Sequence, residues 1–132
     1  ELEPREAMAK LVGFTFDHFR ANPWFIRLLS TENMLRAQHV SKIRDLKALH
    51  SPIIRQIKEI LARGGKAGLF RKGINPLELY ISIAALSYFH LSNIHTLSVV
   101  FASNLMEPRR MAQRRKLAIA MIAAFVEAKQ DL

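Results

Sequence analysis

The sequence LYISIAALSYFHLSNIHTLSVVFASNLM, residues 79–106, decides the fold of this chain. It contains no Asp, Glu, Lys or Arg, although 23% of the whole chain is charged. Asn75 and Pro76 precede it and predict a helix from Pro76, because Asn caps helices and Pro is tolerated in the first turn. This helix is apolar or small on all sides, so every side needs a partner other than water. We expect one side to pack in the chain's own bundle and the other against a second copy.

A membrane span is the main alternative for this stretch. Spanning helices need about 20 consecutive apolar residues, whereas polar side chains interrupt the run from Ser82 onward and cluster around Ser92 and Asn93. Such a cluster is typical of the end of a helix. The sequence therefore favours a core and interface helix that ends near Leu91, and no membrane partner is expected.

The rest of the chain also predicts helices. Residues 1–20 and 23–30 carry apolar side chains at helical spacing, a third segment covers 31–39, and a longer pattern runs over 43–63. That pattern keeps its phase through Pro52, which leaves open one bent helix or two helices with Ser51 as the second cap. Gly64 and Gly65 are expected to end it with positive φ angles. A short helix over 94–103 and a last helix from residues 107–108 complete an all-α, multi-helix bundle.

Composition indicates a single-domain protein of the reducing cytoplasm. The chain has 132 residues, of which half are apolar, and it contains no low-complexity tract and no Cys. Residues 1–132 are therefore expected to form one domain without disulfides or thiolate metal sites. The net charge of +9 is concentrated, since residues 41–73 hold nine basic and two acidic side chains. A solvated polar face is the simplest interpretation of these charges, because charge alone supplies only non-specific affinity.

No arrangement typical of a catalytic or metal site is present. Paired carboxylates are missing from the apolar stretches, and Gly64 and Gly65 do not lie between a strand and a helix, as a phosphate-binding loop would. The histidines form no i,i+4 pair and no HExxH motif; they are His18, His39, His50, His90 and His95. We therefore expect no enzyme activity, no metal and no cofactor.

Bulky side chains with occasional polar tips concentrate on the first helices and on one side of the central helix. A cavity lined in this way is the usual form of a small-molecule site, although an ordinary aromatic core explains each single position equally well. A ligand of such a cavity is expected to be largely apolar. The candidate ligand-binding residues are Phe14, His18, Trp24, Phe25, Leu28, Met34, Ile57, Tyr80, Ala84 and Tyr88.

A second face of the central helix combines small and apolar side chains, and the last helix is uncharged from Leu117 to Val126. Small residues allow helices to approach closely, and a self-complementary face suits a two-fold dimer. We therefore expect the last two long helices of two copies to form a four-helix interface. Its candidate residues are Ser82, Ala85, Phe89, Arg114, Leu117, Met121, Ile122 and Phe125.

Several segments together resemble the C-terminal regulatory domain of the tetracycline-repressor (TetR) family of transcriptional regulators. They are NPWFIRLLSTENMLR at 22–36, SPIIRQIKEILARGGKAGLFRKGINPLELYISIAALSYFHLSN at 51–93, and the closing apolar helix. The most specific feature is a helix that ends in Arg63 and Gly64, passes through residues 68–71, and restarts at Asn75 and Pro76. The resemblance covers nearly the whole chain.

The resemblance implies a homodimer, with an effector pocket enclosed by the earlier helices of each subunit. In the family, effector binding moves the helix that corresponds to residues 1–20, which links to an N-terminal helix-turn-helix head. We expect that head to lie outside this chain, so that DNA is a partner only through it. The implied protein is a cytoplasmic regulator of transcription, for which we expect a repressor; the resemblance alone leaves an activator open.

Two other functions stay open at this point. The first is a helical protein–protein interaction module without a ligand pocket. The second is a basic protein that binds nucleic acid without sequence specificity, which would show as affinity for any DNA that falls steeply with salt. It would use the 42–72 face together with Arg109, Arg110, Arg114, Arg115 and Lys116.

Overall fold

The computed structural model describes residues 1–129, except for the side chains of residues 47 and 49–51. All regular elements in this part of the chain are helical, which confirms the all-α prediction. One isolated antiparallel bridge joins Phe70 to Glu127. In chain order the elements are α1 (Pro4–Ala21), α2 (Pro23–Met34), the 3₁₀ turn η1 (Val40–Lys42), α3 (Leu46–Lys66), α4 (Pro76–Ser92), α5 (Ile94–Val100) and α6 (Pro108–Val126).

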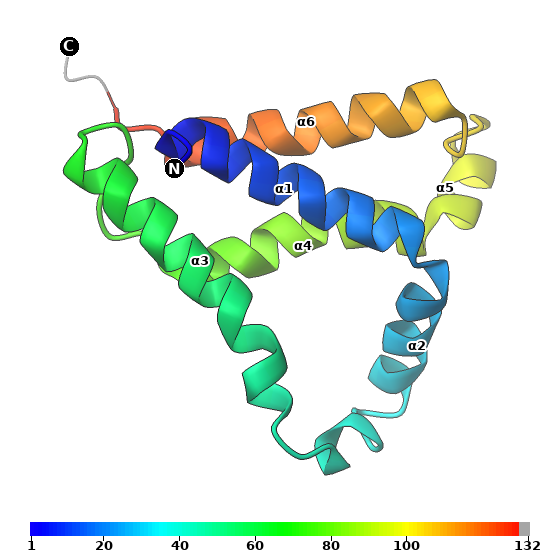
Figure 1. The fold of residues 1–132 in the computed structure, drawn as a ribbon. Coiled ribbons are helices and arrows are strands. Elements are labelled where there is room, and N and C mark those ends of the chain that lie inside the picture. Colours follow the sequence, from blue (N-terminus) through cyan, green and yellow to red (C-terminus); the bar gives the residue numbers. More distant parts are fainter. Residues whose placement is uncertain (130–132) are drawn as a thin grey trace.

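Three helices form the body of the molecule, and two others extend from its opposite ends. Figure 1 shows α1 running between α6 and α4, with α3 leaving one end of this body and α2 the other. The segment that contains η1 joins the far ends of α2 and α3, so that these elements outline a triangle (Figure 1). The short α5 turns the chain from α4 into α6 at the end nearest α2 (Figure 1).

The core lies where α1, α3, α4 and α6 meet. Val12, Ile57, Ile83 and Ala118, one from each helix, are fully buried there. Apolar burial of this kind is the main favourable term in folding, and it follows the helical spacing seen in the sequence. A smaller cluster of Phe16, Ile94 and Met111 joins α5 to the body.

The central helix α4 begins where the sequence predicts. The Asn75 side-chain oxygen accepts hydrogen bonds from the N–H groups of Leu77 (2.9 Å) and Glu78 (3.2 Å), and Pro76 is the first helical residue. The helix ends at Ser92, one residue past the expected end. One side of α4 is buried in the body, whereas Ile81 and Phe89 on the other side are more than half exposed.

Four predicted boundaries are wrong. The long helix begins at Leu46 and not at residue 43, and the short helix from Ile94 ends at Val100 and not at residue 103. Residues 31–39 do not form a separate helix, because α2 continues to Met34 and the chain then leaves the helical path at Arg36 and Ala37, which have positive φ angles. Likewise α3 continues through both of its adjacent glycines to Lys66, and the positive φ angle falls on Gly68 instead (72°). Phe70 supplies the reason, since its ring packs directly against the backbone of α3.

The longer apolar pattern forms one helix, which settles the alternative at Pro52. This proline lies inside α3, and the helix runs through it without a restart. Because no second helix starts there, Ser51 does not act as the predicted cap; the side chains of His50 and Ser51 lie outside the described residues. No helix in residues 1–129 is long and apolar enough to cross a membrane.

Candidate functional site

An open hollow of about 450 Å³ lies between α1 and α3. Its apolar surface includes Leu11 and Phe14 from α1 and Ile53 and Ile60 from α3. Gln56 stands among these side chains, and Lys10, Glu59 and Arg63 supply charged groups at the lining. A concave apolar surface with few polar groups is the form expected of a small-molecule site.

A row of aromatic rings continues from this hollow along α1 to α2 and α4. The ring centres of Phe14 and His18 are 6.3 Å apart and stacked, and His18 meets the edge of Phe25 at 5.9 Å. Phe25 in turn contacts Trp24 at 5.7 Å. These spacings are typical of favourable aromatic pairs. Four of the predicted ligand-binding residues, Phe14, His18, Trp24 and Phe25, therefore lie together in the structure.

Tyr88 joins the row to α4. Its ring lies 5.7 Å from that of Phe19, edge to face, and Phe19 also stacks on Phe25 at 6.2 Å. The Tyr88 hydroxyl is hydrogen-bonded to the Ser30 hydroxyl at 2.8 Å. The side of α4 that carries Tyr88 therefore packs against α2.

The other predicted ligand-binding residues lie in different surroundings. Ile57 is fully buried in the core, Ala84 is partly buried, and Tyr80 is partly buried against the same core, where burial raises the pKa of its hydroxyl. Leu28 and Met34 on α2 are 50% and 82% exposed. These five residues are not part of the aromatic row.

Of the residues that line the hollow, only Phe14 was among the predicted ligand-binding residues. The prediction missed apolar residues on both walls. Leu11, Ile53 and Ile60 read in the sequence as ordinary core positions of two amphipathic helices. Their spacing shows that they share a face of α1 or α3, but not that the two faces meet with a gap between them. The sequence contains no signal for this gap, because the exposed Gln56 belongs to the ordinary polar surface of an amphipathic helix.

Seven of the eight predicted interface residues line one groove of about 620 Å³ between α4 and α6. Phe89, Met121 and Phe125 are 46–59% exposed there, so the groove presents a broad apolar surface. The eighth residue, Leu117, lies on α6 and is 46% exposed. Contiguous exposed apolar side chains of this kind are one feature of interaction surfaces. The seven lining residues are Ser82, Ala85, Phe89, Arg114, Met121, Ile122 and Phe125.

The basic start of α6 is largely used within the molecule. Arg114 donates two hydrogen bonds to the carbonyl oxygen of Leu86, at 3.0 and 3.2 Å, and so ties α6 to α4. Arg115 forms a bidentate ion pair with Asp17 of α1, with both distances 2.9 Å. Arg110 donates to the Ser103 hydroxyl. Three of the five α6 cations that a nucleic-acid surface would use therefore have intramolecular partners.

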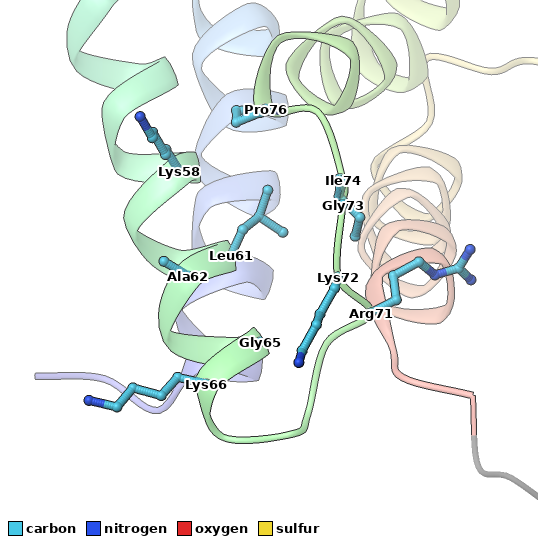
Figure 2. A pocket seen from close by; sticks show the side chains of 10 residues that line it. All are labelled: Lys58, Leu61, Ala62, Gly65, Lys66, Arg71, Lys72, Gly73, Ile74 and Pro76. Atoms are coloured by element: carbon cyan, nitrogen blue, oxygen red, sulfur yellow. The ribbon is translucent and has the colours of Figure 1, made fainter.

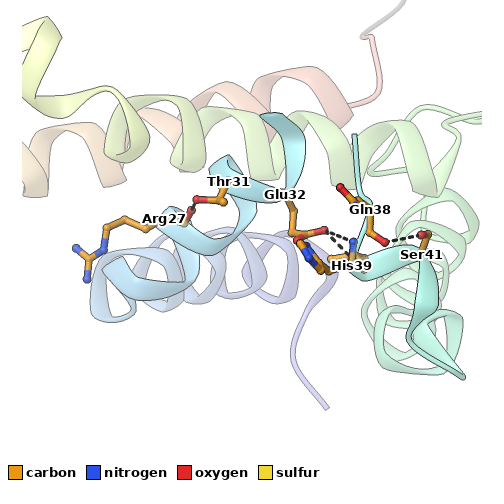
Figure 3. A network of polar contacts seen from close by, with 7 residues as sticks. Arg27, Thr31, Glu32, Gln38, His39 and Ser41 are labelled. Atoms are coloured by element: carbon orange, nitrogen blue, oxygen red, sulfur yellow. Dashed lines mark hydrogen bonds and ion pairs between the residues drawn. The ribbon is translucent and has the colours of Figure 1, made fainter. Parts of the chain in front are cut away.

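Glu32 fixes the segment that joins α2 to α3, a feature that the sequence did not reveal (Figure 3). Its carboxylate is 7% exposed and accepts hydrogen bonds from the N–H groups of His39 (3.1 Å) and Val40 (3.0 Å). Its other oxygen lies 2.7 Å from Nδ1 of His39. The hydrogen bond from Val40 is the main cause that lowers the pKa of Glu32, against the opposing effect of burial.

The remaining titratable groups do not assemble into a metal site in the described part of the chain. No three His, Asp or Glu side chains among residues 1–129 are grouped so that they could hold an ion. His90 is buried beside Arg114, and burial is the larger of two causes that lower its pKa and favour the neutral ring. It lies within the packing of α4 and not in either hollow described above.

Comparison with known proteins gives two findings. The family described as "Tetracyclin repressor-like, C-terminal domain" matches residues 4–122. The chain is also 36% identical over 110 residues to the HTH-type transcriptional repressor NicS of Pseudomonas putida. That alignment covers 83% of this chain and 52% of the repressor, so the chain spans about half the length of this curated relative.

Proposed function

The chain belongs to the tetracycline-repressor-like C-terminal domain family, and from this premise we propose that it is the effector-binding and dimerising region of a transcriptional repressor. The observation that carries the proposal is the family match over nearly the whole chain, residues 4–122. The relative is named as a repressor of the HTH type, and the alignment covers 52% of its length. The proposal therefore assigns DNA binding to a helix-turn-helix head outside these residues, and repression in the cytoplasm to the whole protein.

The proposed effector site is the hollow between α1 and α3 together with the aromatic row. Phe14 belongs to both, since it lines the hollow and stacks on His18. The apolar surface favours a largely apolar small molecule, and Gln56 offers one amide for a polar group of that molecule. Both features support effector binding over a protein–protein interaction module, which needs no hollow.

Signal transfer is proposed to pass through α1. This helix supplies one wall of the hollow, and its first turn lies near the start of the chain, where the head would be joined. An effector that fits the hollow better in one position of α1 than in another shifts the population of the two positions. Couplings of this kind are typically about 1–3 kcal/mol, which changes operator affinity by roughly 5- to 150-fold.

The proposed dimer uses the groove between α4 and α6. Its residues are apolar, small or already bonded within the chain, as Arg114 is to Leu86. A second copy of the same surface would cover Phe89 and Phe125 and complete a four-helix interface. The groove is a separate surface from the hollow, so dimer formation and effector binding can be tested separately.

Effector binding can be measured through Trp24, the single tryptophan of the chain. This side chain is 58% exposed and contacts Phe25, so a ligand in the aromatic row should change its emission. We expect a screen of small, largely apolar compounds to yield ligands that change the emission of Trp24. Phe14→Ala should weaken their binding about tenfold, which corresponds to about 1.4 kcal/mol.

The control is Phe101→Ala, which removes a ring that is 68% exposed at the end of α5 and belongs neither to the hollow nor to the aromatic row. This variant should bind the same compounds with unchanged affinity. Trp24→Ala, followed by calorimetry, should weaken binding without dissociating the dimer. If Phe14→Ala and Trp24→Ala both bind as tightly as the unmodified chain, the proposed effector site is wrong.

A further inference from the structure

Basic side chains gather around a second hollow, of about 410 Å³, between the last turns of α3 and the segment 71–76. Its lining includes Lys58, Lys66, Arg71 and Lys72 and no acidic residue. None of these four side chains forms an ion pair within residues 1–129, whereas three arginines elsewhere do. This part of the molecule therefore carries positive charge without an internal partner.

The lysines lie on two sides of this hollow. Figure 2 shows Lys58 and Lys66 on α3, with their side chains turned outward from the hollow, and Lys72 on the facing segment, with its side chain toward α3. Arg71 turns away from the hollow (Figure 2), and its guanidinium packs 4.7 Å from the centre of the Phe125 ring. We call Lys58, Lys66 and Lys72 the lysine patch.

The surroundings of the lysine patch leave room for an anionic partner. A Cβ atom added at Gly65 or Gly73 would meet nothing within 4 Å, so the backbone is open to approach on both sides. The N–H groups of residues 72–74 have no acceptor within the described chain. Of the acidic residues in adjoining segments, Glu59 lines the hollow with α1 and Glu78 lines a neighbouring hollow, so neither belongs to the patch.

We propose that the lysine patch contacts the phosphate backbone of duplex DNA without reading its base sequence. Lys58 and Lys66 are eight residues apart on one helix, or about 12 Å along its axis. Duplex DNA carries one negative charge per about 1.7 Å of axis, so several phosphates lie within that span. A linear polyanion can therefore meet all three lysines at once, which a small anion cannot.

The patch lies at the end of the molecule where the chain enters. Arg63 of α3 donates a 2.8 Å hydrogen bond to the carbonyl oxygen of Leu2 and lies 3.4 Å from the Glu1 carboxylate. Figure 1 likewise shows the N-terminus close to this end of α3. A head joined before Glu1 would hold DNA on this side. The placement of DNA on this side depends on the function proposed above. The positive charge of the lysine patch does not depend on it.

The test is fluorescence anisotropy of the 132-residue chain with a labelled duplex of about 30 base pairs and arbitrary sequence, over about 50 to 200 mM salt. Each phosphate contact contributes about 0.9 to the slope of log affinity against log salt. The triple variant Lys58→Glu, Lys66→Glu, Lys72→Glu should therefore lower the magnitude of that slope by about 3. From about 200 down to about 50 mM salt, its affinity relative to the unmodified chain should therefore fall by about a further 40-fold.

The matched control is Arg27→Glu, Arg109→Glu, Lys116→Glu, which changes the net charge equally at exposed positions of α2 and α6. It should retain most of the affinity and nearly the full slope. Equal losses in both triple variants, or no binding at about 50 mM salt, would overturn the proposal. Tighter binding to vesicles of anionic phospholipid than to DNA would also overturn it.

Failure of this inference is distinguishable from failure of the proposed function. Sedimentation and the effector titration through Trp24 contain no DNA and do not involve the lysine patch. The patch variant should therefore sediment and bind effector as the unmodified chain does, whichever way the DNA measurement falls.

Discussion

At the scale of single residues, two adjacent glycines in α3 have opposite surroundings. Gly64 is buried, and a Cβ atom there would overlap the ring of Phe70. Its carbonyl oxygen accepts hydrogen bonds from the N–H groups of Leu69 (2.9 Å) and Phe70 (3.1 Å), which bring the chain back over the helix end. Gly65 faces open space. Only the first glycine is therefore required by the packing.

These surroundings predict opposite effects of the same substitution. Gly64→Ala should lower the free energy of unfolding by about 1–2 kcal/mol, because overpacking typically costs about 1–3 kcal/mol and the better helix propensity of Ala offsets part of it. Gly65→Ala should raise it by up to about 1 kcal/mol, since only the propensity changes. Urea unfolding of the two variants measures both values. Equal effects would mean that the Phe70 ring does not rest on Gly64.

At the scale of elements, the buried carboxylate of Glu32 holds the connection between α2 and α3. It satisfies the N–H groups of His39 and Val40 just after the two residues with positive φ, Arg36 and Ala37. A helix end and a turn are thereby tied together by one ionised side chain. Hydrogen bonds to a charged group are stronger than those between neutral groups.

The stability that Glu32 supplies should depend on pH. Its hydrogen bonds lower the pKa of Glu32 in the folded chain below the ordinary value of 4.5. The contribution is therefore complete above the pKa of the unfolded chain and is lost as pH falls through the lower pKa of the folded chain. Glu32→Gln should melt at a lower temperature than the unmodified chain at pH 7, and the difference should shrink below about pH 4.

The control for this measurement is Glu59→Gln, at an exposed position of α3. Exposed substitutions usually change stability by less than about 0.5 kcal/mol, so this variant should melt nearly as the unmodified chain does at pH 7. A melting difference for Glu32→Gln that persists unchanged at low pH would show that the side-chain shape matters there and not the ionised carboxylate.

At the scale of the whole molecule, α1, α3 and α6 pack against the central helix α4 and leave part of its surface uncovered. Ile81 and Phe89 of α4 and Met121 and Phe125 of α6 stay 46–59% exposed. The groove between α4 and α6 joins three of these side chains into one surface. A second copy is the partner that we propose for it.

The dimer proposal predicts that Phe125→Arg converts a dimer into a monomer. The new guanidinium would lie in the apolar groove and next to Arg71, which now packs on the Phe125 ring at 4.7 Å. Burial of an unpaired charge is costly, and the neighbouring like charge adds to the cost. Sedimentation equilibrium over a concentration series measures the change, and circular dichroism checks that the helices remain.

Phe101→Arg is the matched control, because it adds the same charge at an exposed ring outside the groove. It should sediment as the unmodified chain does. The dimer proposal would be wrong if the unmodified chain is a monomer at every concentration, or if Phe125→Arg still forms dimers.

The helices and most of their limits could be predicted from the sequence because their signals are local. Asn75 and Pro76 start α4, and Pro108 starts α6, through chemistry confined to a few neighbouring residues. The family, too, was visible in contiguous segments, and the match over residues 4–122 confirms it. The ends of α2 and α3 were predicted wrongly because residues later in the chain fix them. Val40 donates a hydrogen bond to Glu32 of α2, and Phe70 donates one to the Gly64 carbonyl oxygen of α3.

The sequence by itself determined an all-α chain of this family. It also determined that one helix is too apolar to leave any of its sides exposed to solvent. Only the tertiary structure decided which faces meet: that Phe14 and Phe25 join one row of rings, that Ile57 belongs to the core, and that Arg114 bonds to Leu86. The physical reason is that spacing along a helix specifies a face, whereas the neighbours of that face depend on how separate helices pack. Those packing contacts join residues far apart in the chain.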